Sequence, residues 1–292
     1  MSATIACISG EEVYRQWDAG RIEGTRLGSR DTPFGRSGEI FHVSSDEVPY
    51  FLLVRHGNGL AKTAPSLVPD RANIYALKDL GVDCVLGWAP GGAVTHSIAV
   101  GDLVILSDLI DATCLRERTF FEENPLGYLR QFPVFCPQLR RVLAEILGEM
   151  KLVFHPGGTM VVTEGPRLET PAEIRMYSTV GAEVVSHSFV PEAFLAKELQ
   201  MCYAGVCYVV NYAETGSRHR PFAGGSLFGP LSDKSDGERL AGIVGAQSRI
   251  VRQVALALSA GRGACDCAES MAANILRYNL SPDWRSWFAA AQ

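Results

Sequence analysis

The sequence lacks the features that would place it among membrane or nucleic-acid-binding proteins. No stretch approaches the roughly 18 consecutive apolar residues of a membrane span, and the first residues lack the basic and apolar pattern of a secretory signal. Basic residues are not in excess, because 27 Lys and Arg stand against 32 Asp and Glu, for a net charge of −5. A protein that neutralises nucleic-acid phosphates normally carries a positive surplus. We therefore expect a cytoplasmic protein that binds neither membrane nor nucleic acid.

The signatures of common catalytic and metal sites are missing as well. The sequence has no His-Glu-x-x-His motif, no Cys-x-x-Cys pair, no Gly-x-Ser-x-Gly turn and no glycine fingerprint for nucleotides. Cys265 and Cys267 are spaced too tightly for a usual zinc pair. We interpret them as two incidental thiols near a helix start, with a redox pair as the alternative. We expect no metal site.

Short apolar runs and helical patterns alternate along the chain. The apolar runs do not alternate cleanly with polar residues, which indicates strands buried on both faces; they span 4–8, 50–54, 84–88, 103–106, 160–163, 183–185 and 205–210. The helical patterns span 68–80, 138–149, 171–180, 191–201, 236–260 and 267–278. No low-complexity linker divides the chain. The pattern predicts a single α/β domain over residues 1–292, built on a largely parallel sheet.

Polar or glycine-rich segments follow the predicted strands, where α/β sheets build their ligand sites. They are Ser9-Gly10, Arg55-His56-Gly57, residues 89–92 (APGG), residues 164–167 (EGPR), residues 186–188 (SHS) and residues 211–213 (NYA). Taken singly, each is as typical of a turn or cap as of a site. Residues 215–236 form a predicted long loop, which we interpret as solvated, with a lid as the alternative.

The order of these segments carries more information than any one of them. The most specific is residues 164–177 (EGPRLETPAEIRMY), followed by 181–185 (GAEVV), 190–192 (VPE), 202–204 (CYA) and 210–213 (VNYA). Upstream lie residues 32–35 (TPFG), 55–57 (RHG) and 71–77 (RANIYAL). Over about residues 5 to 215 this pattern resembles the nucleoside phosphorylase family that includes 5′-methylthioadenosine phosphorylase and the trimeric purine nucleoside phosphorylases.

The resemblance implies a fold, an assembly and a reaction. The fold is a twisted mixed, largely parallel central sheet flanked by helices, and the assembly is a homotrimer with active sites near the subunit interfaces. The reaction is reversible phosphorolysis of a purine nucleoside to the free purine and a ribose 1-phosphate derivative. Inorganic phosphate is the co-substrate, and the resemblance implies no metal or organic cofactor.

The resemblance also assigns roles to individual residues. The phosphate-binding positions are Ser9, Arg55, His56, Ala89 and Ser188. Asn211 and Glu169 match the residues that recognise a 6-oxopurine, whose O6 accepts and whose N1–H donates a hydrogen bond. Asn211 is the candidate catalytic residue, because its amide can hydrogen-bond N7 of the departing base without transferring a proton.

Several positions depart from the family pattern. Trp88 stands where a small hydroxyl residue contacts phosphate, Leu168 replaces a Phe that stacks on the base, and His187 replaces a Met under the ribose. Glu11 follows the Ser9-Gly10 turn, where an inward carboxylate would oppose an anion.

These departures leave alternatives open. One is a protein with a degraded phosphate site that binds a flat aromatic or nucleoside ligand without turnover. Another is a hydrolase in which His187 or Glu11 activates water. The choice between 5′-methylthioadenosine and methylthioinosine or inosine also stays open.

Overall fold

A computed structural model describes residues 4–44, 48–57, 63–213, 234–261 and 263–288. The predicted loop at 215–236 lies outside these residues except for positions 234–236, which begin a helix. Both interpretations of that loop therefore stay predictions. Among the helices of the described residues, none is long and apolar enough to cross a bilayer.

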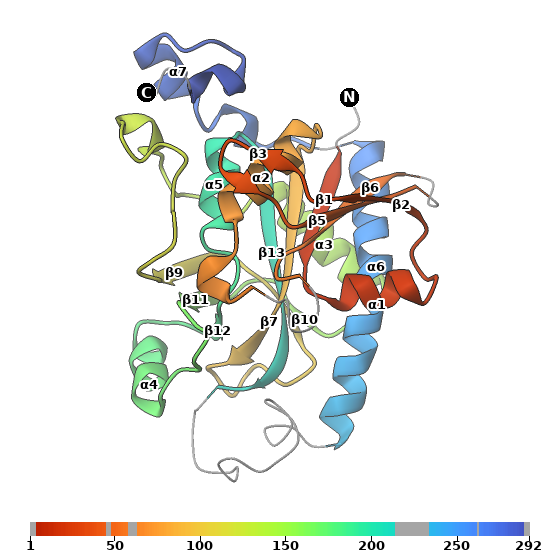
Figure 1. The fold of residues 1–292 in the computed structure, drawn as a ribbon. Helices are drawn as coiled ribbons and strands as arrows, with labels where there is room; N and C mark the ends of the chain where they lie inside the picture. The colour runs from red at the N-terminus through yellow and green to blue at the C-terminus, as the bar shows by residue number, and fades with distance from the viewer. Residues whose placement is uncertain (1–3, 45–47, 58–62, 214–233, 262, 289–292) are drawn as a thin grey trace.

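The described residues form one large sheet and a small two-stranded one. The strands are β1 (Ile5–Ser9), β2 (Gly24–Gly28), β3 (Asp31–Thr32), β4 (Gly35–Arg36), β5 (Glu39–Val43), β6 (Tyr50–Val54), β7 (Cys84–Ala93), β8 (Leu103–Ile105), β9 (Asp108–Ala112), β10 (Phe154–His155), β11 (Thr159–Thr163), β12 (Val184–Ser186) and β13 (Cys202–Tyr212). The large sheet has the order β10-β8-β13-β7-β1-β6-β5-β2, with β12 also paired to β7, β11 between β12 and β9, and β3 and β4 forming the small sheet (Figure 1).

Strand directions in the large sheet are mixed but mostly parallel around the centre. β6, β1, β7 and β13 run parallel to one another, as do β9, β11 and β12. The β2–β5–β6 edge is antiparallel, and so are the β12–β7 and β13–β8 pairs. This architecture confirms the expected fold class.

Helices cover both faces of the sheet and create two apolar cores. They are α1 (Glu12–Asp18), α2 (Asp70–Asp79), α3 (Pro137–Glu149), α4 (Pro171–Thr179), α5 (Glu192–Glu198), α6 (Lys234–Ala260) and α7 (Ala272–Tyr278), with 3-10 turns η2 (Pro65–Leu67), η3 (Pro125–Gly127), η5 (Cys267–Glu269) and η6 (Trp284–Trp287). α2 and α5 pack on one face, and α1, α3 and α6 pack on the other. β7 serves both cores, because successive side chains of a strand point to opposite faces: Val85 and Ala89 join the first core, and Leu86 and Trp88 join the second.

β7 corrects one sequence expectation. Residues 89–92 were expected to form a turn after a strand, but the strand continues to Ala93 and pairs with β13 and β12. A Cβ on Gly91 would lie 2.5 Å from the Cys207 sulfur and 2.8 Å from the Val185 carbonyl oxygen. The glycine therefore permits a close approach of strands and does not mark a turn. The sequence analysis also missed α1 and the strands β2 to β5, β9 and β10.

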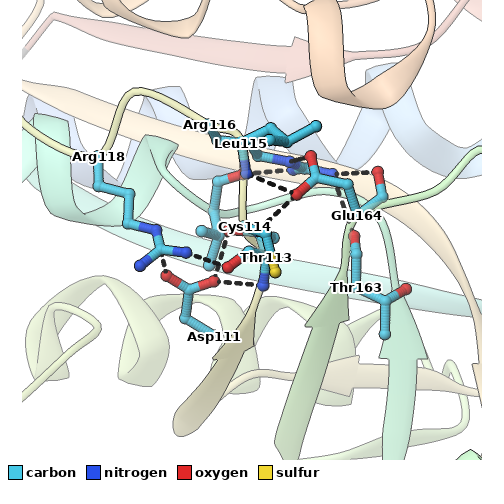
Figure 2. Close-up of polar contacts among 9 residues, drawn as sticks. Asp111, Thr113, Cys114, Leu115, Arg116, Arg118, Thr163 and Glu164 are labelled. Carbon is cyan, nitrogen blue, oxygen red and sulfur yellow. Dashed lines mark hydrogen bonds and ion pairs between the residues drawn. The ribbon is translucent and has the colours of Figure 1, made fainter.

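The buried side chain of Arg116 connects the end of β11 to the segment that enters α5. Arg116 donates to the Val190 carbonyl at 2.6 Å and to the Thr163 and Glu164 carbonyls, both at 3.1 Å. The Glu164 carboxylate in turn accepts from the backbone N–H groups of Cys114 and Leu115, at 2.5 and 3.0 Å (Figure 2). Arg116 thus fixes the end of β11 relative to the segment that enters α5.

Replacing Arg116 with methionine should lower the free energy of unfolding by about 3 kcal/mol, because three carbonyl groups and the Glu164 carboxylate lose a buried donor. Arg118→Met is the matched control, since Arg118 pairs with Asp111 at 3.1 Å but its side chain is 46% exposed. The control should cost no more than about 1 kcal/mol. Urea unfolding of both variants measures the difference, and equal losses would contradict the assigned role of Arg116.

Candidate functional site

A cavity of about 560 Å³ opens at the carboxyl ends of the central strands. The predicted site residues that line it are Ser9, Arg55, His56, Trp88, Leu168, Glu169, His187, Ser188 and Asn211. They come from segments up to two hundred positions apart, and parallel strands bring them to one edge of the sheet. Arg55 and Asn211, which the sequence places at the phosphate and purine ends, therefore share a single cavity.

Ala89 is the predicted site residue that does not line the cavity. Its side chain is buried in the core on the α2 and α5 face, while its neighbours Trp88 and Pro90 line the cavity wall. The extension of β7 explains the difference, because a residue inside a strand points to one core or the other. A backbone contact from Ala89 to phosphate stays a prediction.

Arg55 is held by a buried ion pair. Its guanidinium donates two hydrogen bonds to the Glu192 carboxylate, one of them at 3.0 Å, and Tyr203 donates its hydroxyl to the same carboxylate at 2.6 Å. Burial works to lower the pKa of Arg55, but the charge of Glu192 and its hydrogen bonds to the guanidinium act in the opposite direction, and the pKa is raised. Arg55 therefore stays charged, with its fork in a fixed orientation.

Glu192 and Tyr203 were missed by the sequence analysis. The sequence placed Glu192 only within the predicted helix at 191–201, and it lies in the first turn of α5. The signal that could have identified Glu192 was its position in the Val-Pro-Glu segment of the family pattern. Phe189 lies three residues before Glu192 and has a φ of +78°. The centroid of its ring is 5.9 Å from the guanidinium carbon of Arg55. The chain bends sharply there to carry Glu192 under Arg55.

His56 and Ser9 are each oriented by a neighbour. The Nδ1 atom of His56 lies 3.1 Å from the Thr63 carbonyl oxygen, and since a carbonyl only accepts, this geometry assigns the proton to Nδ1. Ser9 accepts a hydrogen bond from the Gln247 side chain of α6 at 2.6 Å. Gln247, which also lines the cavity, was not foreseen from the sequence.

The purine end is organised around Glu169. Its carboxylate accepts from the Thr163 hydroxyl and lies 3.3 Å from Nε2 of His187. Burial works to raise the pKa of Glu169, but the hydrogen bonds from His187 and Thr163 lower it. Glu169 is therefore an ionised hydrogen-bond acceptor. Gly165, at φ of +66°, lies so close to the His187 ring that a Cβ there would be 2.5 Å from Nδ1, so the glycine fixes the place of that ring.

Asn211 lines the same cavity as Glu169. It follows an irregularity in β13, where the register against β7 shifts between Val209 and Asn211. Its side chain is 6% exposed, and its Oδ1 atom would lie 3.0 Å from a Cβ on Gly92. The bulge and the glycine together set the position of the amide.

Acidic and aromatic residues surround the anion end. Glu11 and Glu12 line the cavity, and each forms an ion pair with Arg15, at 3.1 and 3.2 Å. The Trp88 indole is 2% exposed and stacks on the Tyr208 ring at a centroid distance of 5.8 Å. Trp88 thus forms part of an apolar wall, and Glu11 is directed to a neighbouring cation.

The arrangement has two chemically different ends. A fixed guanidinium, an imidazole and two serine hydroxyls can bind a small anion, and an amide with an ionised carboxylate can bind a flat base with complementary edges. The residues between them are largely apolar, among them Leu168, Val185 and Val210. Such a cavity can bring an anion and a heterocycle-bearing sugar together.

Several known proteins have sequences similar to that of this chain. The model of the phosphorylase superfamily matches residues 5–224. A probable S-methyl-5′-thioinosine phosphorylase of Methanothermobacter thermautotrophicus is 41% identical, with 72% of this chain and 71% of that protein covered. A 6-oxopurine nucleoside phosphorylase of Pyrococcus furiosus is 40% identical, with 72% and 79% covered.

Solved structures extend the likeness to the whole fold. The crystal structure of a methylthioadenosine phosphorylase from an antarctic soil metagenomic library superposes with a TM-score of 0.83 at 24% identity, covering 100% of this chain and 99% of that one. An S-methyl-5′-thioadenosine phosphorylase of Pyrococcus horikoshii is 37% identical in sequence, with 71% of this chain and 79% of that protein covered. With the family model matching most of its length, this chain belongs to the phosphorylase superfamily.

Proposed function

We propose that this protein catalyses the phosphorolysis of a 6-oxopurine nucleoside to the free base and a ribose 1-phosphate derivative, with inorganic phosphate as co-substrate. The observation that carries the proposal is that Arg55, His56 and Ser188, expected at phosphate, and Asn211 and Glu169, expected at the base, all line a single cavity. Phosphate would bind at the cationic end, and the sugar would lie between the two ends. Such placement lowers the barrier by positioning the nucleophile and by stabilising charge on the departing purine.

The base preference follows from hydrogen-bond complementarity. Glu169 is an ionised acceptor, because hydrogen bonds from His187 and Thr163 lower its pKa, and it suits the N1–H donor of a 6-oxopurine. The Asn211 amide can donate to O6 or N7 of the same base. A 6-aminopurine has an acceptor at N1, which would face the Glu169 carboxylate unfavourably. The names of the Methanothermobacter and Pyrococcus furiosus relatives also refer to 6-oxopurine substrates.

For the 5′ position of the sugar we infer a methylthio group, which makes 5′-methylthioinosine the best-matched nucleoside. Two observations support this inference. The cavity contains apolar side chains such as Pro65, Val210 and Val244, which suit a thioether better than a hydroxyl. The Methanothermobacter relative is named for the same nucleoside.

The anion end supports a second candidate function, which is nucleoside binding without phosphorolysis. Glu192 already neutralises Arg55, and Glu11 and Glu12 add negative charge near the place where phosphate would bind. Trp88 occupies the position where a hydroxyl residue is expected. A protein of this kind would bind the base end of a nucleoside with an affinity independent of phosphate. A hydrolase would instead release free ribose.

We also infer a homotrimer and a reducing compartment such as the cytoplasm. Leu115, Tyr128 and Phe132 are large apolar side chains that are 78%, 85% and 88% exposed in the single chain, and a subunit interface would cover them. None of the eight cysteines, which all lie among the described residues, forms a disulfide bond, as is usual where thiols are kept reduced.

Incubating the protein with 5′-methylthioinosine should release hypoxanthine only when phosphate is present. Product analysis separates the candidate functions: ribose 1-phosphate derivatives indicate phosphorolysis, and free sugar indicates hydrolysis. Calorimetric binding of nucleosides with no turnover of any purine nucleoside tested would exclude the proposed reaction and support the binding protein.

Asn211→Asp should shift preference toward 6-aminopurines, because a carboxylate at this position accepts from the exocyclic amine and cannot donate to O6. The ratio of kcat/KM for 5′-methylthioadenosine to that for 5′-methylthioinosine should rise by about 10- to 100-fold, which corresponds to one or two hydrogen bonds. The control is Asn279→Asp at the exposed end of α7, which should leave the ratio unchanged. An unchanged ratio in the Asn211 variant would rule out our assignment of the base site.

The ionisation of Glu169 should be visible in the pH profile of kcat/KM for a 6-oxopurine nucleoside. Its pKa is lowered in the folded protein, so the carboxylate is present above that value and activity falls as the pH drops through it. His187→Phe removes one donor to the carboxylate, so the acidic limb should move to higher pH. Thr163→Val should move it in the same direction, and a limb unmoved in both variants would show that Glu169 does not control it.

A further inference from the structure

Four cysteines converge at a place that the cavity does not include. Cys136 precedes α3, Cys202 is the first residue of β13, and Cys265 and Cys267 flank the start of η5. Their four sulfur atoms all lie within 4.8 Å of one another. None of these residues lines the nucleoside cavity, so the cluster is a separate feature of the molecule.

The spacing of the sulfur atoms matches a tetrathiolate metal site. A zinc ion bound tetrahedrally at about 2.3 Å from each sulfur places the sulfurs about 3.8 Å apart. The Cys202 and Cys265 sulfurs are 3.4 Å apart, which is far beyond the roughly 2.05 Å of a disulfide bond. We propose that Cys136, Cys202, Cys265 and Cys267 bind a structural Zn²⁺ ion as four thiolates.

All four thiols of the cluster can be ionised at the same time only if a cation lies among them. Four thiolates this close would repel one another strongly. A divalent ion removes that obstacle, because a coordinating thiol is deprotonated by the metal.

Groups around the cluster suit a negatively charged metal centre. The backbone N–H of Leu139, in the first turn of α3, points to the Cys136 sulfur at 3.5 Å. Lys197 lies near enough to Cys267 for the charges of the two side chains to interact. Its ammonium group also donates to the Pro133 carbonyl at 2.7 Å. A donor to sulfur and a nearby cation are the surroundings expected of thiolate ligands.

The metal would attach the C-terminal segment to the sheet. Cys265 and Cys267 precede α7, which extends beyond the end of the sheet near the C-terminus (Figure 1). The same segment also contacts the rest of the chain through Asn274, which donates to the Leu126 carbonyl at 2.8 Å, and through Met271 and Trp287, which are buried in the core on the α2 and α5 face. A four-coordinate ion would join three parts of the chain that are more than sixty positions apart. Its role is structural, because four protein ligands leave no open position.

This proposal departs from the sequence expectation of no metal and of incidental thiols at Cys265 and Cys267. The one-residue spacing of that pair is not a zinc signature, and the other two ligands lie far away in the sequence. Only the fold brings Cys202, at the start of a central strand, beside Cys136 and the C-terminal pair.

The test is the metal content of the full-length protein, expressed with added zinc and purified with a reductant and without chelator. Mass spectrometry of the elements should find one zinc per chain. The double variant Cys265→Ser and Cys267→Ser should lose it, while Cys114→Ser, which changes an exposed cysteine, should keep it. Cobalt exchanged into the wild-type protein should show thiolate-to-metal charge-transfer and tetrahedral ligand-field bands that the double variant lacks.

A second measurement needs no variant. Iodoacetamide labelling followed by peptide mapping should show these four cysteines protected in the native protein and labelled after a chelator removes the metal. Protein with less than about a tenth of a zinc ion per chain, whether the four residues are then free thiols or disulfides, would overturn the proposal. Neither readout depends on nucleoside turnover, so this proposal and the proposed function can fail independently.

Discussion

The buried pair of Arg55 and Glu192 is the interaction on which the site depends. Taking both charges out of water is costly, and the pair is stable only because the geometry is bidentate and Tyr203 completes the carboxylate's hydrogen bonds. The pair also affects Asp70, whose pKa is raised well above its usual range by burial and then by the charge of Glu192. Four elements, β6, α5, β13 and α2, therefore meet at one set of charges. Any ligand at the anion end meets a guanidinium that is already oriented.

The sheet separates the two ends of the site. β6 and β1 supply Arg55 and Ser9, whereas β13 and the segment after β12 supply Asn211 and His187. β7 lies between them and contributes Trp88 near one end and the glycines near the other. Because strand spacing is fixed by the hydrogen-bond ladder, the sheet sets the separation of the strand ends that carry Arg55 and Asn211. The loops that complete the purine end are held in turn by Arg116, which bonds to backbone on both sides of that end.

Much of the fold was predictable because its central strands are continuous apolar runs. The ranges expected at 50–54 and 160–163 agree with β6 and β11 to within one residue, and the helix at 138–149 with α3. The edge strand β2 was not predicted, because it is mostly exposed and carries no apolar run. The residues that orient the site, Glu192 and Gln247, were not predicted either. Each acts through a partner that lies more than a hundred positions away in the sequence.

By itself, the sequence determined the α/β class and the set of candidate residues at strand ends, because apolar periodicity and motif order are local properties of the chain. Tertiary structure decided which of those residues share a cavity, and that Ala89 points into the core. It also decided that four scattered cysteines meet. These outcomes depend on strand order and register, which bring distant residues together through pairings that no local pattern specifies.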